Sequence, residues 1–281
     1  MTTAIPRQLD PQRVQRALVC MHFDPAFAAA IRGDGRLDLP EPLTAAERDL
    51  LRAVDPRALK TDAMRRARAV QALLEEYPVS AALLGMPVVD AFFSSLRFRE
   101  AVFTRGSMAL AFASYLEDHS ALVGGVATIE AAAAAVRRAA LRPLPAADVA
   151  DPRAHLQCNP RFAPRIVPGG TLAWYERALI QNGADPLRTL AELRRPWRKR
   201  PPRGGQQFLL IEGKVGGSLA LGGASEGLVR LLLAASRPRP RAELVVVAHE
   251  LGAEGDEADE LLDELAGEDL LLRVSAPPPA A

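Results

Sequence analysis

Within residues 206–275 the period of the apolar pattern changes twice. Short apolar runs at 208–211 and 218–221 flank a glycine-rich segment, which predicts two strands joined by a turn. Apolar residues then recur every three or four positions in three successive stretches, which predicts three amphipathic helices. A last apolar run at 270–274 predicts one more strand. Strands, three short helices and a terminal strand together predict a winged-helix module over residues 206–281.

Helix start and stop signals divide these three stretches. Ser225 is an N-cap candidate for the first helix, which is expected to end at Pro238. Pro240 opens the second helix and Gly252 ends it. The third helix is expected from about Asp256 to Ala266.

The N-terminal part of the chain has a helical period, and we expect residues 1–125 to form a helical bundle. A helix over 8–32 is expected to break at Asp24, because a proline follows it. Thr44 and Glu47 have the spacing of a capping box. Asp62 has the position of an N-cap for a long helix, and a single helix is predicted over 95–119.

Residues 126–205 are expected to connect the two parts. An alanine-rich stretch at 128–141 favours a helix, and a helical apolar period recurs at 171–182. The short runs at 154–158 and 165–167 could form strands. The stretch 194–205 is basic and proline-rich, as linkers are. The predicted class is therefore α+β, mainly α, with a small antiparallel sheet.

The composition does not favour general binding to nucleic acid or membrane. The 281 residues carry a formal net charge of +1, and no run of eighteen apolar residues occurs. The first residues lack the charged and apolar regions of a secretory signal, so a cytoplasmic location without membrane contact is expected.

Charge also bears on what a winged helix would bind here. Residues 254–269 contain nine carboxylates and no Lys or Arg, so a phosphate backbone would be repelled. One interpretation is an ordinary solvated acidic face. The other is a groove between the sheet edge and the third helix that accepts an extended peptide with basic or neutral side chains.

The C-terminal pattern resembles a known recognition element. It includes Leu-Ala-Leu-Gly-Gly-Ala-Ser-Glu-Gly-Leu at 219–228, Arg-Ala-Glu-Leu at 241–244 and Glu-Leu-Leu-Asp-Glu-Leu at 260–265. These runs resemble the winged-helix elements that bind leader peptides in the biosynthesis of ribosomally made, post-translationally modified peptides. The resemblance implies that a peptide adds as a strand beside the third helix. The residues it implies for peptide binding are Leu219, Ala220, Leu221, Glu257, Glu260, Leu261 and Glu264.

The N-terminal part carries a second resemblance. Its runs at 23–27, 43–48, 54–58, 61–62, 65–69 and 72–78 are similar to those of accessory proteins that partner multinuclear non-haem iron-dependent oxidative enzymes. The resemblance implies a non-catalytic subunit that forms a heterodimer with the iron enzyme and presents a precursor peptide to it. Iron is then expected in the partner enzyme, with no cofactor in this chain.

Arginine and aromatic residues in the N-terminal part are candidates for the enzyme-binding surface, because interfaces are enriched in both. The arginines also fit a solvated face, and the phenylalanines also fit a core. The residues selected are Arg65, Arg66, Arg68, Phe92, Phe93 and Arg97.

Catalytic or metal-binding chemistry is not favoured by the remaining residues. The four histidines are never within four residues of one another, which excludes the usual helical metal motifs. Asp118, His119 and Ser120 are contiguous, whereas catalytic triads assemble from separate elements. Cys20 and Cys158 remain as alternative nucleophiles without a recognisable companion motif.

The main rival hypothesis is a transcriptional regulator. It would use the winged helix together with the basic stretch 194–203, where Trp197 could stack on bases. We expect nucleic-acid binding to be the less favoured of the two functions, because the third helix is acidic.

Overall fold

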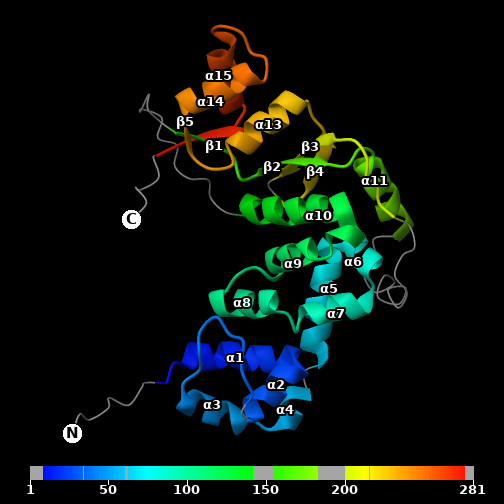
Figure 1. Cartoon of the computed structure of the whole chain (residues 1–281), viewed down its shortest axis with the longest axis vertical. Coiled ribbons are helices and arrows are strands. Elements are labelled where there is room, and N and C mark those ends of the chain that lie inside the picture. The colour runs from blue at the N-terminus through cyan, green and yellow to red at the C-terminus, as the bar shows by residue number, and fades with distance from the viewer. Residues whose placement is uncertain are drawn as a thin grey trace, which may run out of the picture. The chain divides into compact units, whose positions relative to one another are not determined.

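The computed structural model describes residues 9–33, 35–60, 63–141, 155–182, 200–214 and 216–275. The chain is mainly helical with small antiparallel sheets (Figure 1), so the predicted α+β, mainly α class is confirmed. It divides into two compact units. Met1–Val123 with Glu176–Arg200 is called the helical unit below, and Gly124–Tyr175 with Pro201–Ala281 is called the sheet unit.

The helical unit is a succession of short helices. The predicted break at Asp24 is confirmed, since α1 ends before it and its carboxylate accepts from the Ala26 N–H at the start of α2. The predicted capping box is also confirmed, since Thr44 and Glu47 form both of its bonds. Asp62 lies outside the described residues. The helices are α1 (Pro11–Phe23), α2 (Pro25–Arg32), α3 (Ala45–Arg52), α4 (Pro56–Lys60), α5 (Ala63–Glu76), α6 (Pro78–Leu84), α7 (Met86–Phe92), α8 (Leu96–Thr104) and α9 (Met108–Glu117).

The single helix predicted over 95–119 is wrong. Arg105 has a left-handed backbone with φ of 54°, which ends α8, and Gly106 follows it. Ser107 then caps α9 by accepting from the Leu110 N–H. The apolar period continues across this break, so periodicity alone did not reveal it.

Aromatic rings fill the centre of the helical unit. Phe92, Phe93 and Phe112 are completely buried, and Phe92 packs edge-on against Phe112 with ring centroids 5.0 Å apart. The rings come from helices α1, α5–α6, α7, α8 and α9, so one cluster ties together elements far apart in sequence. Its members are Phe23, Tyr77, Phe92, Phe93, Phe98, Phe112 and Tyr115.

The sheet unit contains two three-stranded antiparallel sheets, with strand orders β5-β1-β6 and β2-β3-β4. The predicted hairpin, the three C-terminal helices and the terminal strand are all present, and Ser225 caps the first of these helices. The strands and C-terminal helices of the sheet unit are β1 (His155–Cys158), β2 (Phe162–Val167), β3 (Gln207–Gly213), β4 (Leu219–Gly223), α13 (Glu226–Ala234), β5 (Arg239–Pro240), α14 (Arg241–Glu250), α15 (Glu257–Gly267) and β6 (Leu271–Val274). Helices α10 (Ser120–Ala140) and α11 (Thr171–Asn182) each span a boundary between the two units.

Two strands from the expected connecting region belong to these sheets. Strand β1 pairs with both β5 and β6, with Leu156 opposite Arg239 on one side and Arg273 on the other. Strand β2 pairs with β3 along its length. The C-terminal sheets therefore include residues well before position 206, where the sequence placed the start of this domain.

Helix α10 covers one face of the β2-β3-β4 sheet. Ala132 and Val136 of α10 form a buried cluster with Ala163 and Ile211 of the strands. A Cβ at Gly213 would lie 2.6 Å from the Val136 carbonyl oxygen, so this approach requires glycine. By length and composition α10 could cross a membrane, although half of its apolar window is buried in the structure.

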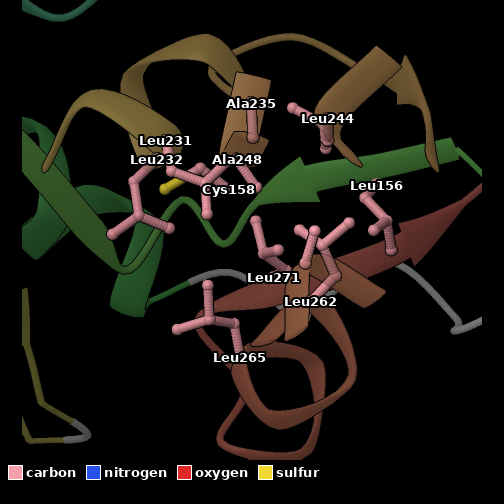
Figure 2. Packing of buried hydrophobic residues seen from close by; sticks show 11 residues of the cluster. Leu156, Cys158, Leu231, Leu232, Ala235, Leu244, Ala248, Leu262, Leu265 and Leu271 are labelled. Carbon is pink, nitrogen blue, oxygen red and sulfur yellow. The ribbon is translucent and has the colours of Figure 1, made fainter. Parts of the chain in front are cut away.

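The other face of this sheet and one face of the β5-β1-β6 sheet share an aliphatic core (Figure 2). Helices α13, α14 and α15 contribute its leucines and alanines, and β1 and β6 contribute Leu156, Cys158 and Leu271. Strand β1 alternates half-buried and buried residues, as expected for one covered face. This core fixes α15 beside β6.

Candidate functional site

Strand β4, which carries the predicted peptide-binding residues Leu219, Ala220 and Leu221, lies at an edge of its sheet. Among the described strands it pairs only with β3. Leu219 and Leu221 pack on the cluster beneath α10, and all three residues are half-buried. The outward backbone groups of β4 are therefore free of a strand partner within the described chain.

The predicted residues on the third helix lie elsewhere in the sheet unit. Glu257, Glu260 and Glu264 of α15 are exposed, and Leu261 is half-buried against the aliphatic core. Helix α15 packs on α14 and β6, and in Figure 1 helix α13 lies between α15 and the strands β3 and β4. The expected groove between β4 and α15 is therefore a wrong prediction. The prediction assumed that the hairpin borders the third helix, whereas β6 does.

Proline distinguishes the four edges of the two sheets. Pro164 lies within the edge strand β2, and the edge strand β5 is two residues long and contains Pro240. Proline supplies no N–H and so weakens an edge as a template for a further strand. Strands β4 and β6 contain no proline. These two edges are the ones suited to accept an added strand.

Carboxylates at one helical spacing form a ridge along α15. Asp256, Asp259, Glu260 and Asp263 are related as i, i+3, i+4 and i+7, so they share one side of the helix. We call these four residues the acidic ridge. Its Asp263 accepts from Arg273 of β6 at 3.3 Å, which shows that the ridge lies on the side of α15 next to β6.

Arg241, the first residue of α14, neutralises part of the acidic ridge. Its Nε donates to the Asp259 carboxylate at 2.8 Å, and its Nη1 donates to the Asp263 carboxylate at 2.7 Å. These hydrogen bonds lower the pKa of Asp263 and raise the pKa of Arg241. Within the described chain Asp256 and Glu260 have no ion pair, so four carboxylates face two guanidinium groups and the ridge stays acidic.

The predicted enzyme-binding residues divide into buried and exposed ones. Phe92 and Phe93 are completely buried, so they form core and not a docking surface of the folded chain, which corrects that assignment. Arg66 donates to the Phe23 carbonyl at 2.6 Å and to Asp90 at 3.0 Å, with its guanidinium over the Phe93 ring. Arg66 therefore links α5 to the end of α1 and to α7.

The other three arginines of that set lie on the surface. Arg65, Arg68 and Arg97 are exposed, and Arg97 lies 3.9 Å from Glu100. They remain a prediction for the enzyme-binding surface.

Neither cysteine has the surroundings of a nucleophile. Cys20 and Cys158 are buried free thiols, and burial raises the pKa of each to about 12. Both are therefore protonated near neutral pH. Among the described residues no three His, Cys, Asp or Glu side chains are grouped to hold a metal ion.

Comparison with protein-family models and a search of curated proteins each return no match. The edge of β6 and its neighbour Asp263 were missed from the sequence. The signal in the sequence is the absence of proline from 271–274, and among the edge strands of the described residues β4 and β6 are the two without proline.

Proposed function

We propose that this chain is a non-catalytic accessory subunit that binds a precursor peptide and presents it to a separate multinuclear iron oxidase in the cytoplasm. The observation that carries the proposal is the pair of proline-free strand edges in the sheet unit. A leader peptide would add as a strand to one of them, taking affinity from main-chain hydrogen bonds and selectivity from its side chains. Such sites commonly bind at micromolar strength, or about 8 kcal/mol.

A winged-helix interpretation of the sheet unit is part of the proposal. Helix α13, strand β5, helices α14 and α15 and strand β6 follow one another in that order, and β1 lies between β5 and β6 in the sheet. This order supports three helices and a small sheet of the winged-helix kind. The acidic α15 would occupy the place of a recognition helix, which favours peptide over DNA as the ligand.

The helical unit is proposed to contact the iron enzyme. Its exposed Arg65, Arg68 and Arg97 are the candidate contacts. Arginine is enriched in protein interfaces because its planar group forms several hydrogen bonds at once.

Co-expression tests the proposal as a whole. The full chain, carrying an affinity tag, would be produced with the iron enzyme and the short precursor encoded beside its gene. We expect a complex of all three that survives size-exclusion chromatography, and loss of peptide modification when the chain is omitted. Retention of DNA and of neither protein would contradict the proposal and favour the regulator. A fully modified peptide in the absence of this chain would also contradict it.

A further inference from the structure

We propose that the peptide-docking edge is β6, and that its occupant is an extended peptide with Lys or Arg at alternate positions, facing the acidic ridge of α15. This inference rests on the proposed function and names the site and the ligand class for it. Among the described strands β6 pairs only with β1, so its other edge is free of a strand partner.

The two faces of β6 differ in chemistry. Leu271 is buried in the aliphatic core and Arg273 contacts Asp263, so these alternate residues point to the α15 side of the sheet. Leu272 and Val274 point to the opposite side and are half-buried. An added strand continues this alternation, so every second side chain of the peptide would lie on the side of Asp263.

Charge selects the class of peptide. Asp263 has a side chain that is 56% exposed although it is bound to Arg241 and Arg273, so a further cation can reach it. Asp256 and Glu260 add two exposed carboxylates on the same side. Acidic side chains on the peptide would be repelled here, whereas Lys or Arg would gain hydrogen bonds to carboxylates.

Strand β4 lacks this selectivity. Its residues are Leu-Ala-Leu-Gly-Gly, without a charged side chain, and Leu219 and Leu221 already pack on the cluster under α10. A strand added there would gain backbone hydrogen bonds but little discrimination between peptides. The comparison therefore favours β6.

Two synthetic probes test the charge preference. Both are labelled octapeptides with blocked ends, one alternating Lys with Val and the other alternating Glu with Val, titrated into the full chain by fluorescence anisotropy. We expect the Lys probe to bind at least tenfold more tightly than the Glu probe, because like charges across an interface are disfavoured. Equal binding of the two probes would overturn the basic-ligand inference.

Charge reversal tests the position of the site on α15. Asp256→Lys with Glu260→Lys reverses the two ridge residues that have no ion pair in the described chain. Glu250→Lys with Glu268→Lys reverses two exposed carboxylates outside the ridge, neither within four residues of a ridge residue, and serves as the matched control. We expect the first double variant to weaken the Lys probe about tenfold and the second about twofold or less. Equal losses would overturn the assignment to the ridge.

Hydrogen exchange of the full chain, with and without the Lys probe, identifies the edge. Protection of the amides of 271–274, with no change in 219–223, is the expected result. Protection at 219–223 alone would overturn the β6 site while leaving peptide strand addition intact. If the Lys probe fails but the precursor encoded beside the gene binds, the ligand class is wrong and the proposed function stands. If neither binds, the proposed function itself fails.

Discussion

The helical and sheet units differ in how they use their polar groups. In the helical unit Arg66 and Arg99 lie over the rings of Phe93 and Phe27, and both donate to backbone carbonyls. In the sheet unit the main core is aliphatic. The proline-free strands β4 and β6 each pair on one side only, so their outer edges have no strand partner in the described chain.

This contrast indicates where binding belongs. Arginines that donate to backbone carbonyls and cover rings stabilise the helical unit itself, because those donors are already used within the unit. Strand edges leave N–H and C=O groups that only another chain or water can satisfy. We therefore assign peptide binding to the sheet unit and a structural role to the core of the helical unit.

The largest effect is expected in the aromatic core. Phe92→Ala removes a completely buried ring that contacts Phe93, Phe98, Phe112 and Tyr115. We expect the free energy of unfolding to fall by about 3–5 kcal/mol, measured by urea denaturation. Leu110→Ala, at a residue that is 41% exposed, is the control and should cost much less. Similar losses for both would mean that the ring cluster does not hold the helical unit together.

A smaller loss is expected in the aliphatic core. Leu262→Ala opens a cavity beneath α15, where Leu262 is completely buried, and should cost about 2–5 kcal/mol. Hydrogen exchange should then speed up in α14, α15 and β6 and leave α7–α9 unchanged. Faster exchange throughout the chain would show that the two units unfold together.

Arg66→Ala tests the internal use of arginine. It removes the bonds to the Phe23 carbonyl and Asp90 and should cost about 1–3 kcal/mol by thermal or urea unfolding. Arg68→Ala, on the exposed side of the same helix, should stay within about 0.5 kcal/mol of the wild type. If Arg66→Ala changes the free energy of unfolding as little as Arg68→Ala does, Arg66 is again a candidate contact for the iron enzyme.

Glu47 gives a prediction on pH. Burial raises the pKa of this carboxyl, but bonds from the backbone of Thr44 and Asp10 and from Arg13 together outweigh it and lower the pKa below its usual 4.5. Because the folded pKa is the lower one, Glu47 stabilises the fold above about pH 4.5, and this contribution is lost as the pH falls through the folded pKa.

The measurement compares the wild type with Glu47→Gln by urea unfolding from pH 7 down to pH 3. We expect a difference of about 1–3 kcal/mol at pH 7 that shrinks below pH 4.5. A difference independent of pH would contradict the assignment.

Local signals in the sequence predicted much of this fold. Thr44 with Glu47 and Ser225 are caps whose hydrogen bonds span three residues, and Pro25 marks the helix break at Asp24, so these boundaries could be predicted without the structure. The break at Arg105 was missed, because a non-glycine residue in a left-handed conformation leaves the apolar period intact.

Long-range pairing limited what could be predicted of the site. The sequence located the exposed carboxylates of α15 and the strand β4, but it joined them in one groove. Only the pairing of β1 with β6 shows which edge borders the helix, and these strands are separated by more than a hundred residues. Phe92 and Phe93 show the same limit, since an aromatic pair fits a core and an interface equally well until burial is known.

The most direct test of whether the sheet unit holds a peptide is a binding titration of the full chain at low and at high salt. One ligand is the precursor peptide encoded beside the gene, and the other is a double-stranded oligonucleotide. We predict that the peptide binds at both salt concentrations with an affinity that changes only slightly, and that the duplex binds weakly or not at all. Tight duplex binding that falls steeply with salt, without binding of the peptide, would contradict this.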